Sequence, residues 1–174
     1  MAAGLGGIFR NSNGDWIVGF HKSFHATSAI QAELMALQEG LKIARDMNFV
    51  DMKIETDSTE IIKLLYEDNQ YLSNTIIEYR LLMHRLKLPT LKYNFREGNE
   101  VAHLLAKEVV KDFSPIKYFY YARPPLFVEL ELIRNKHGIC NSTKYLPTTV
   151  CNSIATLGNN NVLKDYALSM ESYV

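Results

Sequence analysis

Two acidic residues, Glu33 and Asp57, occupy positions from which they can act together. Glu33 lies near the start of the helix-like run AELMALQEGLKIA, and Asp57 ends the strand-like run MKIETD. In α/β proteins the ends of strands carry functional groups, and Asp57 lies at such an end. Glu33 lies near the start of the helix that leads to this strand, so its carboxylate can reach the same edge of the sheet. Each also has a structural explanation, because a helix start favours an acid through the helix dipole and a strand end favours a polar cap.

Apolar spacing and turn residues predict the elements around these acids. Leu5–Arg10 and Trp16–Phe24 flank a turn-rich stretch at 11–15, which predicts a hairpin. Ser28 and Gln31 have capping-box spacing and precede a helix predicted to end at about Met47. The remaining predicted elements are a strand at 52–57, helices starting at 58 and 76, a strand at 91–95 and a last helix capped at 99. This order predicts an α/β fold with a mixed sheet covered by helices.

Composition limits the class of protein. The 174 residues include 19 basic and 19 acidic side chains, so no excess of positive charge indicates nucleic acid or an anionic membrane. No secretion signal begins the chain and no run approaches the roughly 18 apolar residues of a membrane span, so we expect a soluble protein of the nucleus or cytoplasm. Cys140 and Cys151 lack metal-site spacing and are interpreted as free thiols.

Four segments, in a fixed order, carry a resemblance to a known family. They are AGLGGIFRNSNGDWIVGF at 3–20, AELMALQEGLKIA at 32–44, IETDSTEIIKLL at 54–65 and FREGNEVAHLLAKE at 95–108. The chain resembles the ribonuclease H superfamily, and more closely the plant reverse-transcriptase-like ribonuclease H domain of non-LTR retroelements. The resemblance implies a ribonuclease H-like mixed sheet flanked by helices over 1–113 and a family-like segment over 114–136. The Asn-rich remainder, 137–174, lacks sustained periodicity and is predicted to be an irregular, disordered tail.

The resemblance also implies a catalytic site. In the family, four acids hold two divalent ions that cleave the RNA of an RNA–DNA hybrid, and Mg²⁺ suits such oxygen ligands, with Mn²⁺ as a second option. Glu33 and Asp57 match two of the acids and are predicted to be catalytic metal ligands. His103 stands where the family has a fourth acid and is the third catalytic candidate, because an imidazole can orient water or, when protonated, contact a phosphate. Weak or altered metal binding is expected there.

Three further residues are candidates for contact with nucleic acid. Ser58 and Asn99 have helix caps as their alternative roles, and Arg96 has a solvated strand-end charge as its alternative. Glu55 shares a strand face with Asp57, but an exposed strand charge is the preferred interpretation.

The family's first aspartate lies on a strand that would precede residue 1, so the first, central strand of the fold is expected to be missing. Three hypotheses therefore remain open. The chain is an RNA–DNA hybrid endoribonuclease, a monomeric module that binds hybrid or duplex without cutting it, or a truncated retroelement-derived fragment. The first predicts hybrid cleavage that needs a divalent metal, the second predicts binding alone, and the third predicts no cooperative unfolding.

Overall fold

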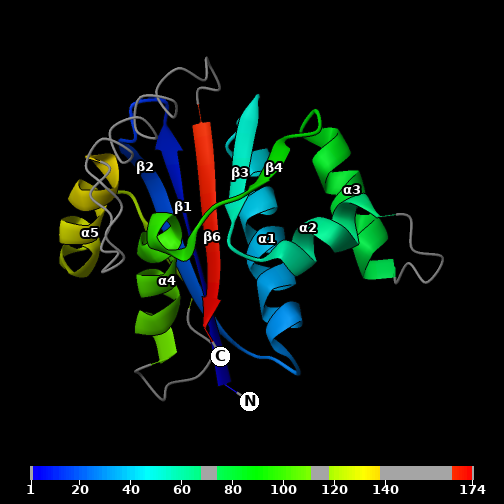
Figure 1. Cartoon of the computed structure of the whole chain (residues 1–174), viewed down its shortest axis with the longest axis horizontal. Coiled ribbons are helices and arrows are strands. Elements are labelled where there is room, and N and C mark those ends of the chain that lie inside the picture. The colour runs from blue at the N-terminus through cyan, green and yellow to red at the C-terminus, as the bar shows by residue number, and fades with distance from the viewer. Residues whose placement is uncertain (1, 68–73, 111–117, 138–165, 174) are drawn as a thin grey trace, which may run out of the picture.

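The structure, a computed structural model, describes residues 2–67, 74–110, 118–137 and 166–173. A six-stranded mixed sheet forms its centre, with the strands in the order β4-β3-β6-β1-β2-β5 (Figure 1). The strands are β1 (Ala2–Asn11), β2 (Trp16–His25), β3 (Met52–Thr56), β4 (Thr90–Tyr93), β5 (Tyr118–Tyr121) and β6 (Tyr166–Tyr173). The helices are α1 (Ala29–Asp46), α2 (Thr59–Tyr66), α3 (Asn74–Arg85), α4 (Arg96–Val110) and α5 (Leu126–Lys136). This arrangement confirms the predicted α/β class.

The predicted hairpin is confirmed as the antiparallel pair of β1 and β2. Its turn is held by the Asn11 side chain, whose Oδ1 accepts hydrogen bonds from the backbone N–H groups of Asn13 at 3.0 Å and Asp15 at 2.9 Å. Gly14 has a φ of 78°, a conformation in which a residue without Cβ is favoured. The turn residues of the sequence therefore set where the two strands reverse.

The first helix begins at the predicted cap. The Ser28 Oγ accepts a hydrogen bond from the Gln31 N–H at 3.2 Å, and the Gln31 Oε1 in turn accepts one from the Thr27 N–H at 2.7 Å. The two side chains thus satisfy donors that a helix start leaves without partners. Beyond the cap, Leu37 and Leu41 are fully buried against the sheet.

The helices cover both faces of the sheet. Along β1, Leu5 and Phe9 belong to the larger hydrophobic cluster, which includes the apolar side of α1. Ile8, on the alternate face, packs instead with Val101 and Leu105 of α4. Because side chains alternate along a strand, these two clusters define an α1 face and an α4 face of the sheet. The helix α5 lies outside α4 and adds Val128 to the second cluster (Figure 1).

The prediction of an irregular tail is wrong for Tyr166–Tyr173, which form β6 in the middle of the sheet. β6 is antiparallel to β1 and parallel to β3, so the central position is filled rather than missing. Two neighbouring ladders offer hydrogen-bond partners to this segment, and such non-local pairing leaves only a short alternating pattern in the sequence. Residues 138–165, with Cys140 and Cys151, lie outside the described residues.

The start of the last predicted helix is also corrected. α4 begins at Arg96, so Gly98 and Asn99 lie within the helix and Asn99 is not its cap. A Cβ at Gly98 would lie 2.6 Å from the Asn94 side chain, which means that the glycine permits close packing rather than a turn. A Gly-Asn pair is typical of a turn. Spacing alone does not identify the Asn94 side chain as the group that packs against Gly98.

Candidate functional site

Asp57 follows the last residue of β3, and the local structure does not need its carboxylate. Ser58 caps α2, since its Oγ accepts a hydrogen bond from the Ile61 N–H at 3.4 Å. The Thr56 hydroxyl accepts one from the Ser58 N–H at 3.2 Å. The predicted cap role of Ser58 is therefore confirmed, and Asp57, which is half-buried, is left without the strand-end cap role that its position suggested.

Glu33 lies in the second turn of α1 and is half-buried. No acid occupies the first turn of this helix, and the favourable effect of the dipole on an acid fades beyond that turn. The helix-dipole explanation of Glu33 is therefore weak. Glu33 approaches from α1, which covers one face of the sheet, whereas α4 covers the other (Figure 1).

His103 and Asp57 share one electrostatic environment on the α4 face. Burial lowers the pKa of His103 below its ordinary value, and the positive charges of Arg96 and Lys107 lower it further. The carboxylates of Glu100 and Asp57 act in the opposite direction and do not reverse the shift. The His103 imidazole is therefore neutral at pH 7, in a form that can accept as well as donate a hydrogen bond.

The nucleic-acid candidates differ in accessibility. Arg96 is exposed at the first position of α4, close enough to His103 to influence its pKa. Ser58 is half-buried and its hydroxyl serves the α2 cap. Asn99 has 0% of its surface exposed, which leaves it no surface to offer to nucleic acid in this arrangement. Arg96 is thus the accessible one of the three beside Asp57 and His103.

A buried ion pair lies next to Asp57, and the prediction of an exposed charge at Glu55 is wrong. The Glu55 Oε2 accepts hydrogen bonds from Arg10 Nη2 at 3.3 Å and from Asn94 Nδ2 at 3.0 Å, and Lys53 also contacts this carboxylate. Glu55 is only 9% exposed. The Asn94 N–H donates to the Thr56 carbonyl at 2.8 Å, so the network fixes the backbone that carries Asp57. An arginine forty-five residues away gave no local indication of this pair.

Loss of the Arg10 charge should destabilise the fold. Arg10→Met keeps an unbranched, mostly apolar side chain but removes the charge, which leaves the buried Glu55 carboxylate with weaker partners, and breaking such a pair costs about 3 kcal/mol. Urea unfolding at pH 7 measures the effect, and the double variant Arg10→Met, Glu55→Gln should recover part of it. A double variant no more stable than Arg10→Met would contradict the role of the pair.

The same pair gives the stability a pH dependence. Burial tends to raise the pKa of Glu55, but Arg10, Lys53 and Asn94 together hold this pKa below its ordinary value. A carboxyl group whose pKa is lower in the folded than in the unfolded protein stabilises the fold above its unfolded pKa. That contribution is lost as the pH falls through the folded pKa. Glu55→Gln should therefore lower the free energy of unfolding at pH 7, and the difference from the unmodified chain should shrink in acid.

The donor types near Asp57 suit a hard divalent cation, but their number does not suffice. Carboxylate oxygens are the preferred ligands of Mg²⁺, and Asp57 and Glu33 are of this kind. In the part of the chain that the structure describes, no group of three or more His, Cys, Asp or Glu side chains could hold a metal ion. The fold brings Asp57 and His103 close to each other. Among the described residues, it does not gather these two and Glu33 into one metal-holding group.

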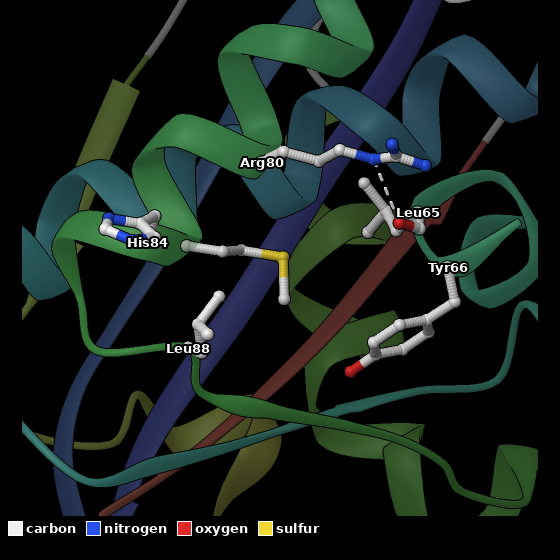
Figure 2. Close-up of a pocket in the computed structure, with 6 residues that line it drawn as sticks. Leu65, Tyr66, Arg80, His84 and Leu88 are labelled. Carbon is white, nitrogen blue, oxygen red and sulfur yellow. Dashed lines mark hydrogen bonds between the residues drawn. The ribbon is translucent and has the colours of Figure 1, made fainter. Parts of the chain in front are cut away.

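The hollow between α2 and α3 is a separate feature. It has a volume of about 360 Å³ and is lined by Leu65, Tyr66, Arg80, Met83, His84 and Leu88 (Figure 2). The Arg80 Nε donates to the Leu65 carbonyl at 3.1 Å, and its Nη2 donates to the Glu67 carbonyl at 2.9 Å. Arg80 therefore satisfies carbonyls at the end of α2, and the mostly apolar hollow holds none of the acids described above.

Comparison with known families gives a match to the one described as reverse transcriptase-like, over residues 1–109. The chain belongs to this family. Its domain is ribonuclease H-like, and such domains bind nucleic acid and generally use divalent metals. Comparison of the chain with curated proteins and with solved structures finds no match. No helix among the described residues is long and apolar enough to cross a membrane.

Proposed function

We propose that this reverse-transcriptase-like domain binds RNA–DNA hybrids and hydrolyses their RNA strand with the help of Mg²⁺ or Mn²⁺. The position of Asp57 carries the proposal, because it follows the interior strand β3, lies near His103 of α4 and is not needed by the local fold. Family membership supplies the nucleic-acid substrate class. The proposal narrows that class to RNA–DNA hybrids and adds hydrolysis of their RNA strand.

Each residue has a proposed part in this activity. Asp57 and Glu33 are the carboxylates that would hold the metal, which when bound would activate a water and stabilise the leaving oxygen. Arg96 is exposed beside the site and suits a phosphate contact. His103 is neutral and can orient a water molecule through hydrogen bonds. The zero net charge of the chain predicts modest affinity, which falls with added salt.

A second candidate function is hybrid or duplex binding without cleavage. Two observations favour it: an imidazole stands where the family has an acid, and the described side chains gather no three-donor metal site. A ribonuclease H-like surface can read the shape of a duplex through its backbone and 2′-hydroxyl groups, independently of chemistry. The two functions differ in one measurable outcome, the fate of the RNA strand.

The test uses the full chain and a hybrid whose RNA strand carries a fluorescent label. We expect retention of the hybrid in a gel and metal-dependent shortening of the RNA, with EDTA abolishing the shortening. Asp57→Asn and Glu33→Gln should each lower the cleavage rate about a hundredfold, because a bound metal supplies several kcal/mol of transition-state stabilisation. Hybrid retention by these variants should change little.

The matched control is Glu129→Gln, an exposed glutamate on α5, the helix that packs on the outer side of α4. Its cleavage rate should equal that of the unmodified chain. Retention with an intact RNA strand in both Mg²⁺ and Mn²⁺ would establish the binding function instead. Absence of both retention and cleavage would exclude both functions.

A further inference from the structure

We propose that Tyr93 and Phe95 form a stacking platform for an unpaired nucleobase, so that the chain prefers RNA–DNA hybrids that continue into a single strand. The inference deepens the proposed function by naming the form of its nucleic-acid substrate, and it rests on that function for the hybrid itself. The platform acts on a base rather than on the reacting phosphate, so it needs no metal ion.

The two rings of the platform touch each other and are open to solvent. Phe95 is 70% exposed and Tyr93 is 47% exposed. Their ring centroids lie 5.5 Å apart at an interplanar angle of 78°, which is an edge-to-face contact. In the part of the chain that the structure describes, neither ring belongs to the two hydrophobic clusters. A phenylalanine this exposed keeps a ring face free, so Phe95 can accept a second flat partner.

The backbone that carries the rings is fixed. The Asn94 N–H donates to the Thr56 carbonyl at 2.8 Å, and the Asn94 Nδ2 donates to the Glu55 carboxylate at 3.0 Å. The Phe95 carbonyl accepts a hydrogen bond from the Gly98 N–H of α4 at 2.9 Å. A ring held between β4 and α4 loses little freedom when a base stacks on it, which favours binding.

The platform lies beside the candidate site. β4 is the edge strand of the sheet, next to β3 (Figure 1). Tyr93 is the ladder partner of Thr56, the residue before Asp57, and adjacent strands lie about 4.8 Å apart. Arg96, which follows Phe95, is the exposed cation near His103. A strand whose phosphate contacts Arg96 therefore has neighbouring bases within reach of the rings.

The charges around the rings favour a nucleotide as the occupant. Lys92 and Arg96 are exposed and flank the two rings in the sequence, and together with Glu97 they give this stretch a net positive charge. Aromatic rings next to cations bind single strands, because the rings stack on bases and the cations contact phosphates. Bases within a hybrid are already paired and stacked on their neighbours. Only a base beyond the end of the duplex is free to stack on Phe95.

A fluorescence experiment on the full chain tests the stacking. The probe is a hybrid with an unpaired extension on either strand, in which the first unpaired base is aminopurine, a fluorescent adenine analogue that is quenched by stacking. EDTA keeps the RNA intact. We expect the unmodified chain to quench the probe and to bind the extended hybrid about tenfold more tightly than a blunt hybrid, since one stacked base is worth about 5- to 150-fold in affinity.

Phe95→Leu is the decisive variant, because leucine is apolar but has no ring on which a base can stack. It should lose the quenching and the preference for the extended hybrid, while its affinity for the blunt hybrid stays unchanged. Phe95→Trp should keep both properties. Thermal unfolding of Phe95→Leu should match that of the unmodified chain, because the ring is mostly exposed, and this separates loss of stacking from loss of the fold.

Two further variants separate stacking from other effects. Arg96→Gln should weaken binding of the extended and blunt hybrids equally, and this loss should shrink in high salt, because it removes a phosphate contact. Phe127→Leu on α5 is the matched control, since Phe127 is 39% exposed and makes an edge contact with Tyr121. It should behave like the unmodified chain.

The outcomes distinguish this inference from the proposed function. Quenching that persists in Phe95→Leu, or equal affinity for extended and blunt hybrids, would overturn the platform even if the hybrid is cleaved once metal is added. A preference for the extended hybrid that depends on Phe95, with no cleavage in Mg²⁺ or Mn²⁺, would support the platform and reject hydrolysis. Absence of binding to either hybrid would overturn both.

Discussion

Leu168→Pro should abolish the cooperative unfolding transition of the full chain. Leu168 pairs with Phe9 on one side of β6 and with Ile54 on the other, so it lies in the middle of the sheet. Proline has no N–H to donate to a ladder and is restricted to edge strands or bulges. Each buried backbone group left without a partner costs about 1–3 kcal/mol, and disruption of the strand affects the ladders on both sides.

Circular dichroism during thermal and urea unfolding measures this effect. Leu168→Val is the matched control, because valine suits a strand and keeps the N–H, so it should retain a sharp transition. Asn159→Pro, between α5 and β6 in the sequence, tests whether any proline in this region is harmful. A transition in Leu168→Pro like that of the unmodified chain would show that β6 does not stabilise the sheet.

The elements that were predicted correctly have local signals. The hairpin is marked by its turn residues, and α1 and α2 are marked by Ser28 and Ser58, whose hydroxyls make the expected caps. Such contacts join residues a few positions apart, so their spacing is visible in the sequence. The core-facing residues Leu37 and Leu41 likewise follow from helical periodicity.

The elements that were missed depend on distant partners. β6 gains its place from β1 and β3, which are more than a hundred residues away, and its alternation extends over only eight residues. Glu55 appeared to be an exposed charge because its partner Arg10 lies on a strand that is not adjacent to β3 in the sheet. In both cases the sheet order, which local patterns do not encode, decides the environment.

The same limit applies to the candidate site. Its two acids were found from their positions in a helix and after a strand, together with the resemblance. The setting of His103 depends on Asp57, which follows a strand far from α4 in the sequence, so local patterns do not predict it.

His103→Asp should make the stability of the protein depend on divalent metal. The present imidazole is neutral at pH 7, because burial and the nearby positive charges lower its pKa. An aspartate there would add a negative charge near Asp57 and Glu100, and like charges without a metal destabilise the fold. Mg²⁺ or Mn²⁺ at a hundred times its Kd would raise the free energy of unfolding of this variant by about 2.7 kcal/mol, because the ion binds the folded state.

Thermal unfolding in EDTA and in metal measures this dependence, with a shift of roughly 2–4 °C expected for each kcal/mol in a chain of this size. Metal-dependent hybrid cleavage should rise at least about tenfold if the new ligand contributes 1.4 kcal/mol in the transition state. His103→Asn is the control, since it is neutral and should gain neither metal dependence nor activity. Equal responses of the two variants would mean that position 103 does not face the metal.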